Sequence, residues 1–345
     1  MHSVTIQPSG HQFQVEEGEA VLAAALRQGF VLPYGCKNGA CGSCKGKILA
    51  GSVDYGTYQP KALPDEEKAQ GKALFCQAKP LSDLVIEART IGAAKDIPVR
   101  TLPCRVQKIE RATQDVMLLG LKLPANERLQ FLAGQYLEFL LKDGTRRSFS
   151  MGNAPHDDEL IQLHVRHVPG GQFTDHVFGR MKERDILRFE GPHGTFFLRE
   201  DSAKPIVLVA SGTGFAPIKS IIEHALKNEI SRPMTLYWGG RRPQDLYLHA
   251  LAAGWAAQGR LTYVPVVSDA LPEDAWRGRT GFVHRAVMQD FPDLSGHQVY
   301  ACGVPIMVDS ARKDFIAGCR LPEDEFYADS FTTQADTAQP APSPR

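Results

Sequence analysis

Four cysteines constrain this chain more than any other feature. Three are spaced as Cys36-x4-Cys41-x2-Cys44, and a fourth, Cys76, lies further along. This spacing is typical of a plant-type 2Fe-2S cluster, whose iron ligands are cysteine thiolates. A structural zinc site is the alternative, but zinc frameworks usually show two separated Cys-x2-Cys pairs, and here one arm is a lone cysteine. We therefore predict that these four cysteines bind a 2Fe-2S cluster, which passes single electrons.

Length and charge limit what surrounds that cluster. A chain of 345 residues exceeds what one hydrophobic core normally serves, so two or three domains are expected. Its 39 basic and 39 acidic residues balance, which argues against a nucleic-acid partner. The N-terminus lacks the pattern of a signal peptide, and no apolar run approaches the length of a membrane span. We therefore expect a cytoplasmic protein with no membrane partner, in which Cys104, Cys302 and Cys319 need no disulfide.

Periodicity indicates a small first domain over residues 1–92. Residues 3–8 and 11–15 alternate between apolar and polar as in a hairpin, and residues 20–28 place their apolar side chains on one helical face. Residues 47–53 and 84–87 have the pattern of strands. A linker of small and polar residues follows at 92–96, so the cluster domain is expected to be a separate folding unit.

After the linker, the pattern of apolar residues differs between two regions, 98–200 and 204–333. Between 98 and 200, short runs typical of strands alternate with turn residues, at 104–109, 116–123, 135–141, 160–166 and 186–191, which predicts a small antiparallel barrel. From 204 to 333 a buried strand at 206–210, a helix at 217–227 and a second buried strand at 234–238 predict an α/β domain with a parallel sheet. The tail at 334–345 carries three prolines and no large apolar residue, so we expect it to be disordered.

Two motifs in the predicted barrel suit a nucleotide with a flat ring. Residues 147–150 (Arg-Ser-Phe-Ser) end a strand and offer a guanidinium, an aromatic face and a hydroxyl. Residues 170–174 (Gly-Gly-Gln-Phe-Thr) open a helix with free amides and a threonine cap, a natural seat for a pyrophosphate. Each motif alone is weak, because an Arg-x-aromatic-Ser run is common by chance and a Gly-Gly turn before a helix is more often only a turn. Their matching places in one domain favour the nucleotide.

The α/β region carries a third motif directly after its first strand. Residues 211–217 (Ser-Gly-Thr-Gly-Phe-Ala-Pro) have proline where a dinucleotide fingerprint has its third glycine. Proline is favoured in the first turn of a helix, so this loop can still present amides to a diphosphate. Cys302 ends another buried strand, where ligands of parallel sheets gather. An inert core thiol is the alternative for Cys302.

The order of these motifs resembles the iron-sulfur flavoprotein reductases of the ferredoxin-NADP reductase superfamily, over residues 1–331. Within that group the closest similarity is to the CDP-6-deoxy-delta-3,4-glucoseen reductases, in the runs YGCKNGACGSCKG, FLAGQYLEF, HVRHVPGGQF, GPHGTFFLRE, SGTGFAPIKS and YACGVPIMVDSARKDF. The nucleotide domain also resembles NAD(P)H:flavin reductases. The resemblance implies a multidomain α+β protein with a β-grasp ferredoxin domain, an antiparallel β-barrel FAD domain and an α/β parallel-sheet nucleotide domain.

The resemblance also implies residue roles. Ser150, near the reactive flavin nitrogen, and Cys302, beside the nicotinamide, are the expected catalytic residues. The residues expected around FAD are Tyr136, Arg147, Ser148, Phe149, Ser150, His164, Arg166, Gly171, Gln172, Thr174 and Phe331. Those expected to bind NADH or NADPH are Gly212, Thr213, Gly214, Pro217, Arg241, Cys302 and Gly303. One departure is Phe149, which stands where the family usually has tyrosine.

These cofactors imply a direction of electron flow. NADH or NADPH gives a hydride to FAD, and electrons leave singly through the cluster to a protein acceptor, a dehydrase or an oxygenase component. The alternatives are a stand-alone NAD(P)H:flavin or ferric reductase, which needs no cluster, and a redox sensor, which needs no nicotinamide site. We expect a monomer. Arg241 and Arg242 suit the 2′-phosphate of NADPH, whereas Asp245 suits the ribose of NADH.

Overall fold

The computed structural model describes residues 1–89 and 97–332. Its chain forms two compact units, one of Met1–Ile97 together with the chain from Asp329 onward, and one of Pro98–Ala328. The linker predicted at 92–96 and the tail predicted at 334–345 lie outside the described residues. Within the described ranges, no helix combines the length and the apolar character needed to cross a membrane.

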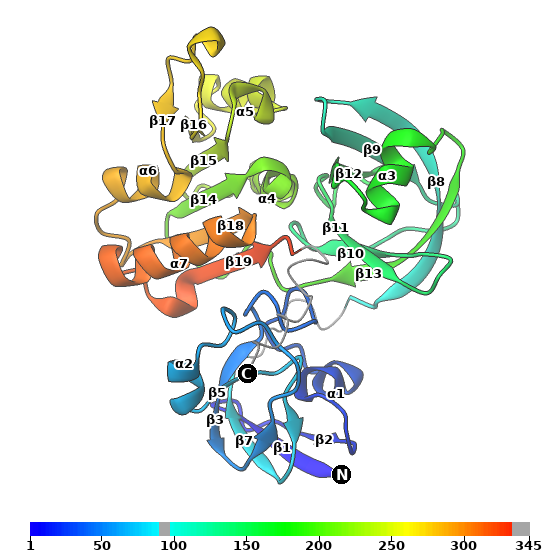
Figure 1. The fold of residues 1–345 in the computed structure, drawn as a ribbon, viewed down its shortest axis with the longest axis vertical. Helices are drawn as coiled ribbons and strands as arrows, with labels where there is room; N and C mark the ends of the chain where they lie inside the picture. The colour runs from blue at the N-terminus through cyan, green and yellow to red at the C-terminus, as the bar shows by residue number, and fades with distance from the viewer. Residues whose placement is uncertain (90–96, 333–345) are drawn as a thin grey trace, which may run out of the picture. The chain divides into compact units, whose positions relative to one another are not determined.

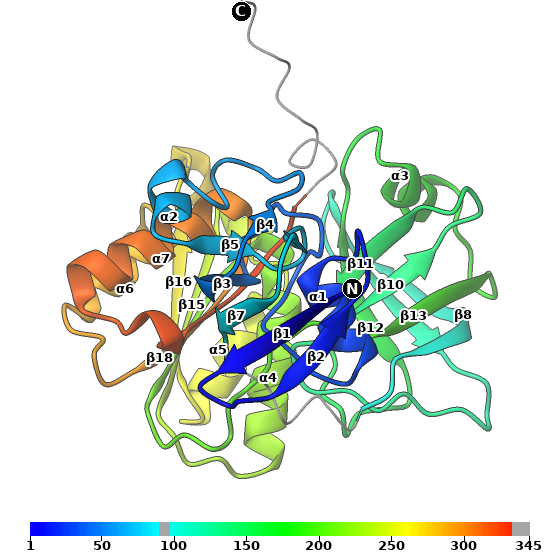
Figure 2. The same ribbon diagram turned by 90° about the horizontal axis from the view of Figure 1, so that it is seen from below.

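The N-terminal unit is built on a five-stranded sheet in the order β2-β1-β7-β3-β5, visible in Figure 2. Its strands are β1 (His2–Gln7), β2 (Gln12–Val15), β3 (Lys45–Ala50), β5 (Lys72–Leu74) and β7 (Leu84–Glu87). The helix α1 (Val21–Arg27) buries its apolar face in the same core as the sheet. The predicted hairpin, helix and last strand are thereby confirmed.

Three short elements of this unit carry no periodic signal, and the sequence did not predict them. They are α2 (Asp65–Ala69), β5 and β6 (Lys79–Pro80). The strand predicted over 47–53 is also wrong in extent, because the chain leaves the sheet after β3 and pairs separately as β4 (Val53–Asp54) with β6. A shift in the β3–β7 register between Ile48 and Ala50 marks where the strand ends.

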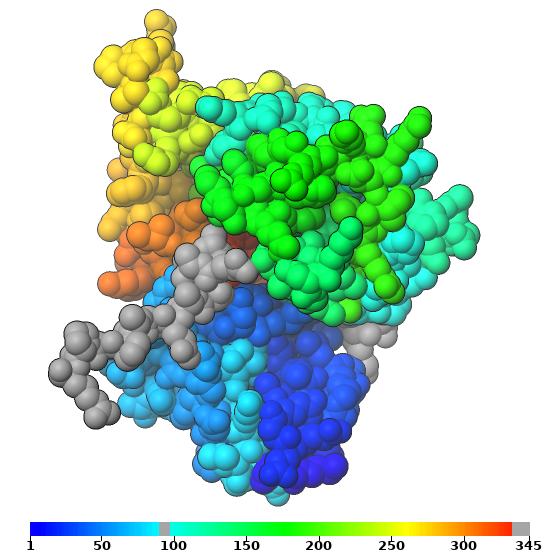
Figure 3. Space-filling view, turned by 45° about the vertical axis from the view of Figure 1, so that its right-hand side comes forward, coloured from blue at the N-terminus to red at the C-terminus, as the bar shows by residue number. Residues whose placement is uncertain are grey.

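The second unit begins with a six-stranded sheet in the order β11-β10-β13-β8-β9-β12. The strands are β8 (Arg100–Arg111), β9 (Val116–Lys122), β10 (Tyr136–Leu140), β11 (Arg146–Ser150), β12 (Ile161–Arg166) and β13 (Ile186–His193), and every pair between them is antiparallel. A bridge between Met151 and Leu163 joins the two edges of the sheet at one point. With the helix α3 (Gln172–Gly179), these strands form one packed body, cyan-green to green in Figure 3.

A second six-stranded sheet follows, in the order β17-β16-β15-β14-β18-β19. Its strands are β14 (Ile206–Ser211), β15 (Met234–Gly240), β16 (Thr262–Val267), β17 (Arg279–Thr280), β18 (Gln298–Gly303) and β19 (Phe326–Ser330). The pairs from β17 to β18 along this order are parallel, as predicted. The helices α4 (Phe215–Lys227) and α5 (His249–Ala257) lie on one side, and α6 (Val283–Asp290) and α7 (Pro305–Cys319) pack on the other (Figure 1).

Side-chain alternation along β14 and β15 explains these two layers. Val207, Val209 and Tyr237 are buried in one apolar core with α6 and α7. Trp238, the next residue, points to the opposite face, where its ring stacks on Phe215 of α4 at 3.8 Å between centroids. Because both faces of the sheet are covered, most residues of β14 and β15 are apolar, which is why the sequence predicted both as buried strands.

Candidate functional site

The four predicted cluster cysteines lie as two pairs. The amides of Cys36 and Cys41 each donate to the sulfur of the other, both at 3.4 Å. The thiol groups of Cys44 and Cys76 are hydrogen-bonded to each other. In the part of the chain that the structure describes, no three of these sulfurs lie within 4.8 Å of one another. Four sulfurs about 2.3 Å from a single zinc ion could be no more than about 4.6 Å apart, so the arrangement fits two metal atoms and not one.

Within the cysteine loop, hydrogen bonds favour the thiolate of Cys36, whereas burial and neighbouring thiols raise the pKa of Cys41 and Cys44. The pKa of Cys36 is lowered to about 7 by a hydrogen bond from Cys41, helped by the backbone amides of Asn38 and Ala40. All four cysteines are free of disulfides. Amides aimed at cluster sulfurs are also the groups that hold and tune such a cluster. The loop therefore fits a 2Fe-2S cluster in both its sulfur spacing and its donors.

The second cysteine pair depends on a glycine of the same loop. The pKa of Cys76 is lowered by its hydrogen bond with Cys44 and by the amide of Gly39. Gly39 has φ +80°, and a Cβ there would lie 2.8 Å from the carbonyl oxygen of Thr57. Only glycine combines that dihedral angle with that contact. Gly39 thus lets the loop bring an amide to a cysteine that lies far along the chain.

The predicted flavin motif is divided between the two faces of β11. Ser150 pairs with Tyr136 across the β10–β11 ladder, and Phe149 pairs with Leu137. Because directly paired residues share a face, Ser150 and Tyr136 lie on one side and Phe149 on the other. Ser150 is 6% exposed and Tyr136 is 5% exposed. The half-buried ring of Phe149 lies 5.1 Å from that of Phe173 on α3, so it packs against the sheet's own core.

The start of α3 differs from the prediction in one respect. Thr174 is not a cap, since Gly171 takes the N-cap position and makes no side-chain hydrogen bond there. The Thr174 hydroxyl instead donates to the carbonyl oxygen of Val168 at 2.9 Å and accepts from the amide of Val168 at 3.2 Å. These bonds close the loop before the helix. The first amides of α3, among them that of Gln172, are therefore without a side-chain cap, as an anion seat requires.

The glycine loop and the end of β18 meet at the carboxyl ends of neighbouring parallel strands. A Cβ on Gly214 would lie 2.2 Å from the carbonyl oxygen of Cys302. The indole Nε1 of Trp238 donates to the carbonyl oxygen of Gly212 at 3.1 Å and so holds the first part of the loop. Cys302 itself is fully buried, so the structure leaves the core-thiol alternative open.

The other residues expected at the nicotinamide site lie in the same loop and strand end. Thr213 belongs to a single 3-10 turn that connects β14 to α4, and Pro217 lies in the first turn of α4, which begins at Phe215 and not at Pro217 as predicted. Gly303 has φ +146° and ends β18. The loop therefore presents a short helix start beside the end of a neighbouring strand.

Two residues of β12 approach the α/β region. The ring Nδ1 of His164 lies 2.8 Å from the hydroxyl oxygen of Tyr247. Burial, together with the charge of Lys219, lowers the pKa of His164 to about 3, so its ring is neutral. Arg166 donates to Asp115 at 3.0 Å. Its Nη1 also lies 3.3 Å from the position that a Cβ on Gly212 would take, so Arg166 borders the glycine loop.

The charged residues after β15 are not equivalent. Asp245 accepts the amides of Arg241 and Arg242 at 2.8 and 2.9 Å, so its carboxylate caps the turn. The guanidinium of Arg242 makes two 2.8 Å bonds to Asp274. The side chain of Arg241 is 78% exposed and lies 3.5 Å from Asp269. Of these two arginines, Arg241 is therefore the more exposed and the less tightly paired.

A carboxylate–histidine cluster in the antiparallel sheet escaped the sequence prediction. Ligand atoms of Glu138, Glu190 and His193 lie within 4.8 Å of one another. The guanidinium of Arg146 bonds both carboxylates, at 3.2 Å to Glu138 and 2.7 Å to Glu190. Arg146 already bonds both carboxylates and offsets one of their two charges, so the cluster is explained by ion pairs without a metal. Phe331 follows β19 and is half-buried, and its expected place beside FAD stays a prediction.

Three family models match the chain one after another. Residues 4–81 match a 2Fe-2S iron-sulfur cluster binding domain, residues 103–198 an oxidoreductase FAD-binding domain, and residues 208–313 an oxidoreductase NAD-binding domain. Each match contains the motif that predicted it. The three cofactors expected from the sequence are thereby confirmed.

Known proteins are similar over nearly their whole length. The CDP-6-deoxy-L-threo-D-glycero-4-hexulose-3-dehydrase reductase of Yersinia pseudotuberculosis is 41% identical over 330 residues, which cover 95% of this chain and 98% of that protein. Reductase component 2 of terephthalate 1,2-dioxygenase from Comamonas is 37% identical, with 96% and 98% covered. The crystal structure of a cytochrome P450 reductase from Amycolatopsis aligns with a TM-score of 0.75 and 34% identity, covering 96% of this chain and 99% of that one.

Proposed function

The chain belongs to the iron-sulfur flavoprotein reductases of the ferredoxin-NADP reductase superfamily, and we propose that it takes electrons from NADH or NADPH and delivers them singly to a partner enzyme. One observation carries this proposal. A single chain joins an N-terminal domain that holds two cysteine pairs to the two nucleotide-binding domains of a reductase. When bound, FAD accepts a hydride and returns electrons one at a time, and the 2Fe-2S cluster carries single electrons.

The residues of the antiparallel sheet have distinct tasks in this proposal. Ser150 holds its hydroxyl at the flavin edge from a buried position beside Tyr136. Arg147 and the uncapped amides at the start of α3 bind the FAD pyrophosphate, because both offer donors to an anion. Ser148, Phe149, His164, Arg166, Gly171, Gln172, Thr174 and Phe331 complete the proposed FAD site.

The α/β region places the nicotinamide cofactor. Amides at the start of α4 bind its diphosphate, and the crowded contact between Gly214 and Cys302 fixes where the loop ends. Cys302, with Gly303, positions the nicotinamide ring for hydride transfer. Arg241 binds the cofactor at the ribose that carries the 2′-phosphate in NADPH. Its exposed side chain favours a phosphate at that position. Gly212, Thr213 and Pro217 shape the loop.

The finer architecture is part of the same proposal. We infer that the N-terminal sheet is a β-grasp fold over residues 1–92, and that the antiparallel sheet over 98–200 closes into a barrel. The bridge between Met151 and Leu163 supports closure, since it joins the two edge strands. The nucleotide domain over 204–333 completes these boundaries, and we propose that the protein works as a monomer.

The acceptor is proposed to be a protein that takes single electrons. The similar proteins named above include a reductase for a dehydrase and a reductase component of a dioxygenase, and both classes need electrons from an outside source. A stand-alone flavin reductase is disfavoured, because free flavin accepts a hydride without an iron-sulfur domain.

The test is a direct comparison of acceptors with the purified full chain. NADH and NADPH are supplied in turn, and the reduction of cytochrome c, FMN and a candidate dehydrase or oxygenase component is followed. We expect rapid reduction of cytochrome c and of one protein partner. Rapid reduction of free FMN with no reduction of cytochrome c would overturn the proposal in favour of a flavin reductase.

A further inference from the structure

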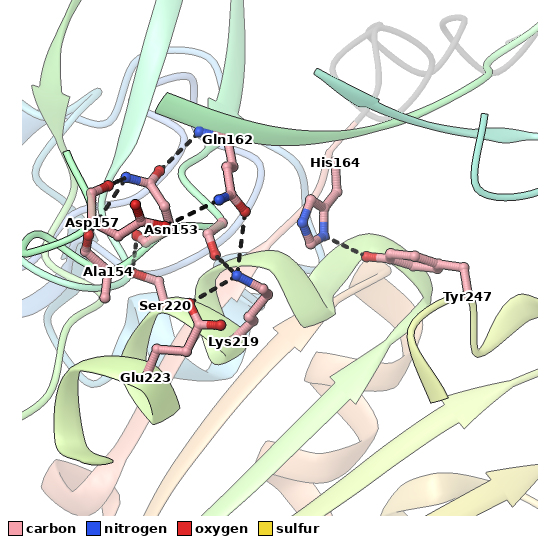
Figure 4. Close-up of polar contacts among 10 residues, drawn as sticks. Asn153, Ala154, Asp157, Gln162, His164, Lys219, Ser220, Glu223 and Tyr247 are labelled. Carbon is pink, nitrogen blue, oxygen red and sulfur yellow. Dashed lines mark hydrogen bonds and ion pairs between the residues drawn. The ribbon is translucent and has the colours of Figure 1, made fainter. Parts of the chain in front are cut away.

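Two consecutive side chains of α4 bond to two consecutive carbonyls that follow β11. The Nζ of Lys219 donates to the carbonyl oxygen of Gly152 at 3.0 Å, and the hydroxyl of Ser220 donates to that of Asn153 at 2.7 Å. Lys219 is 6% exposed and Ser220 is fully buried. Figure 4 shows both side chains reaching from α4 toward the same short segment. These bonds join the helix of the nicotinamide site to the backbone just beyond Ser150.

Lys219 has an acceptor for each of its three N–H groups. Besides Gly152, it bonds the side-chain oxygen of Gln162 on β12 at 3.3 Å and the carboxylate of Glu223 on α4 at 2.8 Å (Figure 4). An ammonium has three donors and no acceptor, so these three bonds use every hydrogen-bond donor of the Lys219 side chain. The charge is paired with Glu223, and Lys219 therefore does not supply a free cation to a ligand.

The accepting segment is itself held in place by β12. The amide of Gly152 donates to the carbonyl oxygen of Gln162 at 2.7 Å, and the amide of Gln162 donates to the side chain of Asn153 at 2.9 Å. Asn153 also donates to the carbonyl oxygen of Asp157 at 2.7 Å. The carbonyls that Lys219 and Ser220 contact are thus part of a fixed network, visible in Figure 4.

The directional hydrogen bonds of Lys219 distinguish this contact from ordinary apolar packing. Apolar surfaces tolerate small slides against each other, whereas a buried ammonium is satisfied only when all its acceptors lie at hydrogen-bond distance together. Lys219 lies in the second turn of α4, close to the glycine loop that begins the helix. Gly152 lies close to Ser150 on the other side. A slide of α4 that moved the glycine loop would break bonds to Gly152 or Gln162.

We propose that Lys219 is a positioning residue for hydride transfer, holding the nicotinamide-binding loop in register with Ser150 while touching neither cofactor. The inference rests on the proposed roles of those two sites. Ser220 supports the same register through Asn153. The pair acts through α4, so it governs how fast the hydride passes and not how tightly the dinucleotide binds.

The test replaces Lys219 by methionine in the full, cofactor-loaded chain. Stopped-flow absorbance follows FAD reduction by NADH or NADPH, and titration measures the affinity for NAD⁺ or NADP⁺. We expect the rate constant of flavin reduction to fall about ten- to hundredfold, as for a displacement of about 1 Å, with affinity changed less than about threefold. Lys227→Met, at the exposed end of α4, is the matched control and should leave both values unchanged.

Two measurements distinguish a misplaced nicotinamide-binding loop from a partly unfolded protein. A partly unfolded preparation lowers the amplitude of the fast phase, whereas misplacement lowers its rate constant. In protein stripped of FAD, amide hydrogen exchange of residues 151–154 should be faster in Lys219→Met than in Lys227→Met. If Lys219→Met fails to fold, Ser220→Ala removes one bond of the pair without touching the charge, and it should lower the rate constant several-fold at unchanged affinity.

The outcomes decide between the possible roles. A wild-type rate constant in Lys219→Met, or in Ser220→Ala where that variant is used instead, overturns the inference. Equal losses of rate and affinity also overturn it, because Lys219 would then bind the dinucleotide. Failure of the proposed function looks different, since the wild-type protein itself would show no flavin reduction by NADH or NADPH.

Discussion

Gly214→Ala should slow hydride transfer while leaving the protein folded. The new Cβ would lie 2.2 Å from the carbonyl oxygen of Cys302, a separation that real Cβ atoms do not show. The loop and the end of β18 must therefore move apart by about 1 Å, and overpacking of this kind costs about 1–3 kcal/mol. A displacement of about 1 Å at a reacting centre lowers the rate about a hundredfold.

The assay is stopped-flow reduction of bound FAD by NADH and by NADPH. Gly254→Ala is the matched control, because Gly254 lies inside α5 with no atom within 4 Å of the added Cβ. Alanine there should stabilise the helix by about 0.5–1 kcal/mol and leave the rate unchanged. A Gly214→Ala protein that reduces its FAD at the wild-type rate would refute the view that this contact sets the nicotinamide position.

Three further predictions concern other parts of the molecule. Removing residues 1–95 should leave a yellow protein that reduces ferricyanide and fails with cytochrome c, because flavin reaches the first acceptor directly; equal cytochrome c activity in both forms would contradict this. Arg241→Ala should raise the KM for NADPH about tenfold and change that for NADH less than twofold, since a charge-assisted bond to a 2′-phosphate is lost; equal changes in steady-state assays would speak against that role. Because the pKa of His164 is about 3 in the folded chain, below its usual 6.5, the unfolded state binds a proton that the folded state does not, and stability falls as the pH drops below about 6.5. In His164→Gln the melting temperature should therefore fall less between pH 7 and pH 5, and parallel curves for both proteins would count against a buried neutral histidine.

Local patterns carried most of the fold and the cluster site. The spacing of Cys36, Cys41 and Cys44 acts within one loop, and the buried strand β14 is a continuous apolar run up to Ser211. Elements without such a signal were missed, because α2 and β6 are short and polar and are held by contacts from elsewhere.

Contacts that no sequence motif specifies explain the remaining differences. Thr174 was predicted as a cap from its place in the motif, but its hydroxyl bonds back to Val168. The contact of Tyr247 with His164 joins residues far apart in the chain, and no spacing rule predicts it from the sequence. The same is true of Lys219, whose partners become visible only when α4 and β12 are seen together.

The central claim is that electrons leave this protein one at a time through the cluster. Cys76→Ser tests it most directly, because the variant removes one of the four thiolates from the second pair and leaves the Pro98–Ala328 unit untouched. Iron content, the visible spectrum and NADH- or NADPH-dependent reduction of ferricyanide and of cytochrome c are measured on the same preparation. We predict loss of the cluster spectrum and of cytochrome c reduction, with bound FAD and ferricyanide reduction retained. Undiminished cytochrome c reduction in protein that has lost its iron would contradict the account.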